Sequence, residues 1–213
     1  MSRLQWKVCG MRDGANIRLV AALSPDYMGF IFYRRSRRYV GDAFTLEEEF
    51  PASIRRVGVF VNELTGEIVR LANKHGLHFI QLHGDETIEQ CDAIRSKGYG
   101  VIKAFGMSSK FNFEKLRSYA NVIDYFLFDT KGNNYGGSGM TFDWRILRRY
   151  DLQKPFFLSG GITADNITGI DILEGLNLHA IDVNSGVESE AGLKDVSLIK
   201  ELKMGMKNIK LFR

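Results

Sequence analysis

Eight short apolar segments alternate with helical segments along this chain, and the alternation predicts a (β/α)8 TIM barrel. The segments are apolar over most of their length, which is typical of parallel strands covered on both faces. A chain of 213 residues is near the lower size limit for this fold and is long enough for a sizeable core. We therefore expect one domain, residues 1–213. A doubly wound open sheet is the alternative, but it normally uses fewer strands and lacks glycine turns on its last two strands.

The predicted strands are short runs of mostly apolar residues. They are Leu4–Val8, Tyr27–Phe32, Val57–Val61, Phe79–Leu82, Val101–Phe105, Tyr125–Phe128, Pro155–Leu158 and Ala180–Val183. The sixth strand shows the layout most clearly, because Asp129 ends its apolar run and the glycine-rich loop Gly136–Gly139 follows. Ligands of parallel α/β folds bind at the carboxyl ends of such strands. Asp129 is therefore placed where chemistry usually occurs, the alternative being that it only caps a loop.

Predicted helices fill the intervals between the strands. They are expected over Arg12–Leu23, Thr45–Phe50, the interval from Asn62 to Gly76, the interval from Asp85 to Gly98, Phe113–Tyr119, Phe142–Arg149, Thr163–Gly175, and from Asp195 to about Met206. Asn62, Asp85 and Asp195 are the predicted N-caps, and Gly76 is a predicted C-terminal stop. Cys91 lies on the apolar stripe of its helix, so we expect it to be a buried packing residue.

The composition is that of an ordinary globular chain, with 45% hydrophobic and 25% charged residues. No apolar run approaches the ~20 residues of a transmembrane helix, and Met1–Leu4 leads directly into the first strand rather than into a signal peptide. The two cysteines, Cys9 and Cys91, are far apart, which indicates a reducing compartment and no disulfide framework. We expect a cytoplasmic protein without a membrane partner.

The net charge of +4 and the pI of about 9.0 fit either a nucleic acid or an anionic small substrate as the partner. The run Arg34–Arg38 is the only dense basic cluster, and it is short. A solvated loop is the alternative to a functional role for this run. We expect a small molecule as the partner and no nucleic acid.

In a TIM barrel the residues that follow the strands line one mouth. At these positions the chain has Cys9, the arginine run, Asn62, His83, Phe105, Asp129, Ser159-Gly160-Gly161 and Asn184-Ser185-Gly186. The last two of these are glycine-rich turns, which let backbone N–H groups approach an oxyanion, and a following helix would add its positive end. Barrels often bind phosphate at this location. We therefore predict a phosphate site there, the alternative being two ordinary tight turns.

Cys9 and Asp129 face each other across the predicted mouth, at the ends of the first and sixth strands. A thiol and a carboxylate around one small substrate suit the roles of general base and general acid. The thiol must be partly ionised to act as a base, and Lys7 or a helix end could favour the thiolate. The alternatives are that Cys9 is a small buried hydrophobe and that His83 only supports the site. No group of His, Cys and carboxylate residues has metal-ligand spacing, so we expect no metal.

A set of motifs along the whole chain resembles the phosphoribosylanthranilate isomerases, a family of tryptophan-biosynthesis enzymes. The motifs are Lys7–Met11, Gly29–Tyr33, Ser36–Val40, Val57–Asn62, Gln81–Gly84, Phe128–Lys131, Gly136–Gly139, Phe142–Trp144, Leu158–Gly161 and Asp182–Glu188. They occur in order and at the expected spacing, and together they are specific although each alone would not be. Gly132–Asn134 and Lys203–Arg213 are less characteristic of the family and leave only the oligomeric state open.

The resemblance implies an Amadori rearrangement of N-(5-phosphoribosyl)anthranilate to 1-(o-carboxyphenylamino)-1-deoxyribulose 5-phosphate. It implies that Asp129 is the general acid and Cys9 the general base, and that no cofactor is needed because the aniline nitrogen acts as the electron sink. The substrate-binding residues are then Arg38, His83, Gly160, Gly161, Asn184, Ser185 and Gly186. Arg38 is implied to hold the anthranilate carboxylate. The protein would be a monomer or a homodimer.

Two other functions remain as alternatives at this stage. The related phosphosugar isomerase of histidine biosynthesis uses aspartates as both acid and base, so a cysteine after the first strand argues against it. A non-catalytic barrel that binds a phosphosugar is disfavoured by the presence of both Cys9 and Asp129.

Overall fold

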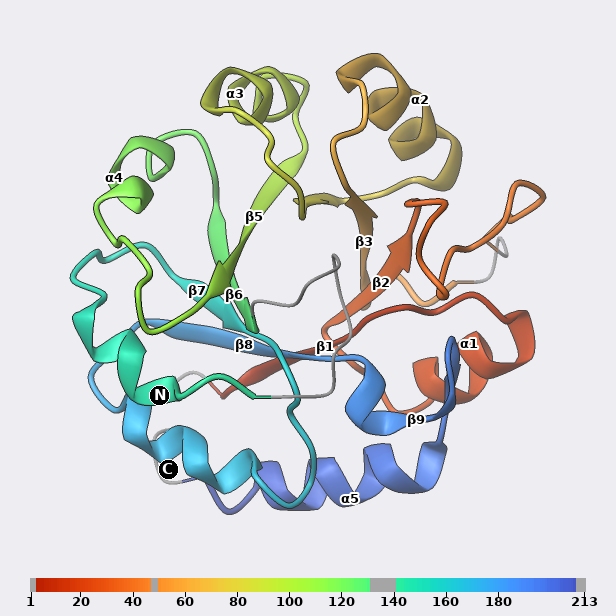
Figure 1. Ribbon diagram of the computed structural model, residues 1–213. Helices are drawn as coiled ribbons and strands as arrows, with labels where there is room; N and C mark the ends of the chain where they lie inside the picture. Colours follow the sequence, from red (N-terminus) through yellow and green to blue (C-terminus); the bar gives the residue numbers. More distant parts are fainter. Residues whose placement is uncertain (1–2, 47–49, 131–140, 210–213) are drawn as a thin grey trace.

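Eight parallel strands close into a barrel in the computed structural model, which describes residues 3–46, 50–130 and 141–209 (Figure 1). The strands are β1 Gln5–Val8, β2 Tyr27–Ile31, β3 Arg55–Phe60, β4 Phe79–Leu82, β5 Gly100–Met107, β6 Tyr125–Thr130, β7 Phe156–Leu158 and β8 Leu178–Val183. Each strand pairs with the next in sequence, and β8 pairs with β1 to complete the ring. The predicted fold class is confirmed, and all eight predicted strands are present.

Helices surround the barrel on its outside (Figure 1). The α-helices are α1 Gly14–Ala21, α2 Thr65–His75, α3 Ile88–Arg95, α4 Lys115–Tyr119 and α5 Val196–Met206. The 3-10 helices are η1 Trp144–Arg149, η2 Ile167–Leu173 and η3 Ser185–Val187. A small antiparallel hairpin of β9 Glu188–Glu190 and β10 Leu193–Lys194 follows η3 and leads into α5. The hairpin and η3 lie beside the carboxyl end of β8, so they border the mouth.

The barrel interior is filled in layers, as expected for this fold. Buried apolar side chains make the lower layers, and they are Tyr27, Val57, Ile102, Ala104, Leu127, Phe157 and Ala180. Cys9, Ile31 and Val59 pack together nearer the mouth. Lys7, Gln81 and Asp182 are also buried. Side chains two residues apart on a strand share a face, so Lys7 lies on the same side of β1 as Cys9.

Two predicted α-helices are 3-10 helices instead. Phe142–Arg149 is replaced by η1, and Thr163–Gly175 by the shorter η2. The Asn166 side chain accepts a hydrogen bond from the Thr163 N–H and donates one to the Gly161 carbonyl. Such side-chain bonds to nearby backbone compete with helix formation. They hold the chain after β7 in a turn and delay the start of the helix to Ile167.

Two of the three predicted N-caps are wrong. Asn62 has a left-handed backbone, with φ of 51°, and its Oδ1 accepts a hydrogen bond from the Asp85 N–H, whereas α2 begins after Leu64. The cap of α3 is Thr87 rather than Asp85. The cap at Asp195 is confirmed, because its side chain accepts hydrogen bonds from the N–H groups of Ser197 and Leu198.

Other predictions at the level of single elements have mixed outcomes. Gly76 ends α2 in the left-handed conformation, and Cys91 is fully buried, as predicted. No helix is assigned to Thr45, Leu46 or Phe50, and residues 47–49 lie outside the described part of the chain. The predicted loop Gly136–Gly139 also lies outside it.

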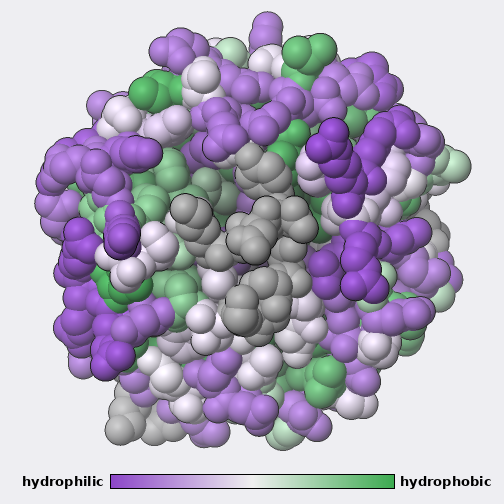
Figure 2. Space-filling model, viewed as in Figure 1, coloured by the Kyte–Doolittle hydropathy of each residue, from purple (hydrophilic) through white to green (hydrophobic). Residues whose placement is uncertain are grey.

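The described surface is mainly polar. The face seen in Figure 2 is hydrophilic around its rim, and its hydrophobic groups are scattered. No helix within residues 3–46, 50–130 and 141–209 is long and apolar enough to cross a membrane.

Candidate active site

A single pocket brings together all nine residues that the sequence analysis named for catalysis and binding. Its lining includes Cys9, Arg38, His83, Asp129, Gly160, Gly161, Asn184, Ser185 and Gly186. These residues lie at or beyond the carboxyl ends of β1, β2, β4, β6, β7 and β8. The pocket is partly open to solvent, and about 770 Å³ of space that protein atoms do not fill lies in it and in the solvent at its opening.

Cys9 lies at the end of β1 with only 4% of its surface exposed. Its backbone N–H donates to the Val183 carbonyl at 2.8 Å, which ties the residue to β8. The thiol lies directly over Gly29, since a Cβ added to that glycine would be 2.7 Å from the Cys9 Sγ and 3.1 Å from the Lys7 Nζ. Because Gly29 has no side chain, β2 leaves space for the Cys9 thiol and the Lys7 ammonium.

Burial raises the pKa of the Cys9 thiol above its usual value, while the Lys7 ammonium beside it acts in the opposite direction. The net shift is upward, so at neutral pH the ligand-free enzyme holds Cys9 as the thiol. The expectation that Lys7 favours the thiolate is right in direction, but the effect of desolvation is larger.

Lys7 and Asp182 form a buried ion pair beneath the thiol. The Lys7 Nζ donates to the Asp182 Oδ2 at 2.8 Å, and their side chains are 0% and 4% exposed. Burial by itself would lower the pKa of Lys7, but Asp182 and Cys9 hold that pKa above its usual value. The second carboxylate oxygen, Oδ1, is buried without a hydrogen-bond partner among the described residues.

Asp129 ends β6 and is held by two contacts. Its Oδ1 accepts a hydrogen bond from the Thr130 N–H at 2.8 Å, and its Oδ2 lies 3.3 Å from the His83 Nε2. The other ring nitrogen of His83 lies 2.8 Å from the Gln81 Nε2. With the Gln81 amide oriented as in the structure, Nδ1 accepts and the ring proton is on Nε2, directed at Asp129. His83 therefore contacts the carboxylate and orients it.

The turns after β7 and β8 pack against each other. Gly160 and Gly161 have φ of 91° and 65°, a region that favours glycine. Gly186 has ordinary φ, but a Cβ there would be 2.1 Å from the Ile162 carbonyl oxygen. The helices that follow these turns were expected to direct their positive ends at a bound anion. That effect is smaller than expected, because η3 has only three residues and η2 begins at Ile167. An anion at these turns would be bound by backbone N–H groups rather than by a long helix dipole.

Arg38 is the member of the arginine run that points into the mouth. Its Nε and Nη2 bind the Glu188 carboxylate at 2.7–3.0 Å, and its side chain is 12% exposed. Arg34 forms an exposed ion pair with Asp42, and Arg35 is exposed. The resemblance implies that Arg38 holds the anthranilate carboxylate, and the structure shows that one edge of its guanidinium is already bound to Glu188.

Sequence reasoning missed four polar residues around the pocket. Gln81 and Asp182 line it, and Glu188 and Lys194 lie behind Arg38. Asp182 and Gln81 had a detectable signal, because each is a polar residue inside a short, otherwise apolar strand. Glu188 and Lys194 had none, since both lie in a hairpin after β8 whose return toward Arg38 is a tertiary feature.

The fold and the pocket define a class of protein: a (β/α)8-barrel enzyme with a thiol and a carboxyl group at one mouth, beside glycine turns suited to an anionic group. Among the described residues, no group of three or more His, Cys, Asp or Glu side chains could hold a metal ion. The groups present can donate and accept protons and bind anions.

Comparison with known proteins identifies the family. The profile of the family described as N-(5'-phosphoribosyl)anthranilate (PRA) isomerase matches residues 6–203. The chain is 46% identical over 197 residues to an N-(5'-phosphoribosyl)anthranilate isomerase of Parabacteroides distasonis, a match that covers 91% of this chain and 89% of the relative. The chain belongs to the N-(5'-phosphoribosyl)anthranilate isomerase family, the isomerases of tryptophan biosynthesis.

Two solved structures resemble the whole barrel. The phosphoribosyl anthranilate isomerase of Thermotoga maritima superimposes with a TM-score of 0.83 at 35% identity, covering 97% of this chain and 100% of that one. A phosphoribosyl anthranilate isomerase in complex with reduced 1-(o-carboxyphenylamino)-1-deoxyribulose 5-phosphate superimposes with a TM-score of 0.79 at 31% identity, covering 97% and 100% of the two chains.

The space over Gly29 leads to a first prediction. In Gly29→Ala the new methyl group would overlap the Cys9 Sγ and crowd the Lys7 Nζ, so isomerase turnover should fall by about tenfold or more while the backbone remains unstrained. Gly66→Ala is the matched control, because nothing lies within 4 Å of a Cβ at that position in α2. Turnover and thermal unfolding of both variants are the measurements. A Gly29→Ala enzyme as active as Gly66→Ala would show that the position of the thiol is unimportant.

Proposed function

We propose that this barrel converts N-(5-phosphoribosyl)anthranilate to 1-(o-carboxyphenylamino)-1-deoxyribulose 5-phosphate by general acid–base catalysis, with Asp129 as the acid and Cys9 as the base. The observation that carries the proposal is that both groups line one pocket together with the two glycine turns. The relatives' names indicate the reaction, and the residues present supply the groups that it requires.

Asp129 acts in the first step. Its carboxyl proton goes to the ring oxygen of the ribose while the lone pair of the aniline nitrogen forms a double bond to C1′. The bond between C1′ and the ring oxygen breaks, leaving a protonated Schiff base and a free hydroxyl at C4′. The contacts of Asp129 with His83 and with the Thr130 N–H support the role, because they hold the carboxylate in one orientation.

Cys9 acts in the second step. Its thiolate removes the proton from C2′, and the electron pair moves through C1′ to the positively charged nitrogen. The enolamine formed in this way tautomerises to the ketone, with no net change in protons. After the step Cys9 is a thiol and Asp129 a carboxylate, so one proton must return to Asp129 before the next turnover.

The ionisation of Cys9 is the demanding part of this scheme. Burial raises the pKa of the thiol, and Lys7 lowers it. The ligand-free pocket holds Cys9 as the thiol, whereas the second step needs the thiolate. A substrate cation at the Schiff-base stage would favour the thiolate, because opposite charges in a buried site attract strongly.

The phosphate and carboxylate of the substrate require two anion sites at opposite ends of the pocket. We assign the phosphate to the turns at Gly160-Gly161 and Ser185-Gly186, where glycine lets backbone N–H groups approach closely. We assign the anthranilate carboxylate to the edge of Arg38 that does not contact Glu188. Asn184 lies beside Arg38, since a Cβ at Gly10 would meet both its Oδ1 and the Arg38 Cδ.

The ligand is thus a small anionic molecule, and one chain supplies all the residues named. Cys9 and Cys91 are both free and buried, which supports a reducing, cytoplasmic setting. The oligomeric state stays a prediction, which is a monomer or a homodimer.

The acid–base assignment leads to a second prediction. Cys9→Ser and Asp129→Asn should each lower kcat by about 10²-fold or more, with a smaller change in substrate binding, because each removes proton transfer but keeps the shape of the pocket. Cys91→Ser is the matched control for the thiol, since Cys91 lies in α3 away from the pocket. The decay of substrate fluorescence measures turnover. Wild-type-like turnover in either site variant would remove that residue from the mechanism.

The third prediction concerns the phosphate turns. Gly186→Val should raise KM strongly, because its Cβ would overlap the Ile162 carbonyl oxygen and push the two turns apart. Gly161→Val should do the same through its positive φ. Inhibition by inorganic phosphate is the second readout and should weaken in parallel. An unchanged inhibition constant would place the phosphate elsewhere.

The fourth prediction concerns the carboxylate end. Arg38→Ala should lose ~1.5–3 kcal/mol of substrate binding, the usual cost of removing a charge-assisted hydrogen bond. Arg35→Ala, at an exposed position of the same run, should change little. Lys at position 38 should restore only part of the loss, because a point charge cannot bind two groups as the planar fork does. Comparison of kcat/KM for the three variants tests this, and equal values for Arg38→Ala and Arg35→Ala would exclude Arg38 from the site.

A further inference from the structure

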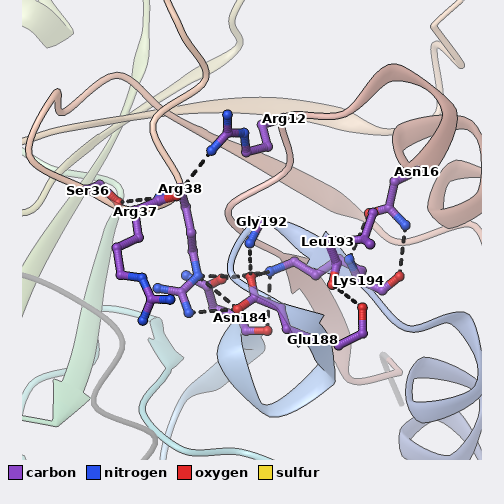
Figure 3. Close-up of polar contacts among 11 residues, drawn as sticks. Arg12, Asn16, Ser36, Arg37, Arg38, Asn184, Glu188, Gly192, Leu193 and Lys194 are labelled. Atoms are coloured by element: carbon purple, nitrogen blue, oxygen red, sulfur yellow. Dashed lines mark hydrogen bonds and ion pairs between the residues drawn. The ribbon is translucent and has the colours of Figure 1, made fainter.

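Arg38 and Asn184 belong to a group of polar residues whose other members, Glu188, Gly192 and Lys194, the mechanism does not use. We call it the Glu188 cluster, and it consists of Arg38, Asn184, Glu188, Gly192 and Lys194 (Figure 3). Its members come from the loop after β2, from the end of β8 and from the β9–β10 hairpin. The cluster therefore joins three parts of the chain at one side of the mouth.

Glu188 is the centre of the cluster. Its Oε1 accepts hydrogen bonds from the Arg38 Nε at 2.9 Å, the Lys194 Nζ at 2.6 Å and the Gly192 N–H at 3.0 Å. Its Oε2 accepts from the Arg38 Nη2 at 2.7 Å. The side chain is 5% exposed. Both oxygens of the Glu188 carboxylate are thus hydrogen-bonded, and the carboxylate contacts two cations, Arg38 and Lys194.

Lys194 is held rigidly in this cluster. Its side chain is 0% exposed and also donates to the Asn184 Oδ1 at 2.7 Å. The Asn16 side chain in α1 binds both the N–H and the carbonyl of Lys194 at 2.8 Å. The backbone and the ammonium of Lys194 are therefore both held in place, and the ammonium is directed at Glu188 and Asn184.

The charges of the cluster explain why a second cation is useful. Arg38 and Glu188 alone would form a neutral pair, which attracts an anion only weakly. With Lys194 the cluster contains two cations and one carboxylate, and so carries a net positive charge. Among the described residues no protein group accepts a hydrogen bond from the Arg38 Nη1. The Nη1 edge of the Arg38 guanidinium therefore remains available to a ligand, and Arg38 is part of the pocket lining.

We propose that Lys194 is a positioning residue for substrate binding: it neutralises Glu188 so that Arg38, which Glu188 orients, keeps its full charge for the carboxylate of the substrate. The proposal rests on the proposed function, in which Arg38 holds that carboxylate. Lys194 does not contact the substrate. It acts through Glu188 and Arg38, and it also directs Asn184 toward the pocket.

The ionisation of Lys194 supports the proposal and adds a pH dependence. Desolvation lowers the pKa of Lys194 to about 8, although Glu188 and Cys9 oppose the shift, and Arg38 adds to it. These are the charged or ionisable groups that face it from β9, from β1 and from the loop after β2. A lowered pKa means that the positive charge is present below about pH 8 and is lost as the pH rises through that value. Binding of an anion at Arg38 should therefore weaken above about pH 8.

The test compares two ligands that differ only in the carboxylate. They are the reaction product, 1-(o-carboxyphenylamino)-1-deoxyribulose 5-phosphate, and its analogue with a plain phenylamino group. In Lys194→Met the affinity for the product should fall roughly fifteen- to thirtyfold, the effect of removing one charge about 8–10 Å away at an effective dielectric constant of about 20. Affinity for the plain analogue should stay within about twofold. Lys200→Met, which removes an exposed cation of α5, should leave both affinities unchanged.

The affinities of the same two ligands can also be compared in the wild-type protein as the pH is varied. Between pH 7 and 9 the ratio of the two affinities should decrease with a midpoint near 8, and in Lys194→Met the ratio should be flat. Titration of Cys9 affects both ligands, so it cancels in the ratio. Thermal unfolding shows whether Lys194→Met folds. If it does not, Lys194→Gln and the wild-type pH series test the role of Lys194 instead.

The outcomes separate this inference from the function on which it rests. Equal losses for both ligands in Lys194→Met, or a flat wild-type ratio, would overturn the role of Lys194 while Arg38→Ala still discriminates between the ligands. If Arg38→Ala does not discriminate either, the assignment of the carboxylate to Arg38 fails first. Selective loss for the product in both variants supports the proposal.

Discussion

The buried ion pair between Lys7 and Asp182 is the interaction on which the rest of the site depends. The two residues are register partners in the β1–β8 pairing that closes the barrel, and their side chains meet at 2.8 Å beneath the pocket. Removing water from two charges is costly, and breaking such a pair by losing one partner typically destabilises a protein by about 3–5 kcal/mol. Two buried charges therefore carry a desolvation cost that a hydrophobic pair of similar volume would not.

The charge of Lys7 acts on the layer above the pair. Cys9 directly follows β1, and the Lys7 ammonium opposes the rise in the pKa of its thiol, as the more weakly acting Lys194 also does. Gly29 on β2 leaves the space in which thiol and ammonium meet. The Lys7 ammonium therefore acts on the thiol over a short, dry distance, where electrostatic effects are stronger than in water.

A second group of buried charges lies beside the first, between the loop after β2 and the hairpin that follows β8. Glu188 is buried with Arg38 and Lys194, and burial of a carboxylate is tolerated because each oxygen is hydrogen-bonded. The two groups share one design, in which a charge buried behind the pocket sets the orientation or ionisation of a residue that lines it.

The sequence by itself determined the fold class and the eight strands, and a parallel barrel places the residue after each strand at one mouth. The choice of nine site residues among those positions came from the resemblance to the family as well. It did not determine the caps at Thr87 and Leu64 or the 3-10 helices η1 and η2. At η2 the side-chain bonds of Asn166 hold the preceding turn. Only the tertiary structure decided that Arg38 binds Glu188, that Lys194 reaches the same carboxylate and that Lys7 pairs with Asp182. These contacts join residues up to 175 positions apart, and no local periodicity encodes which distant charges meet once the barrel closes.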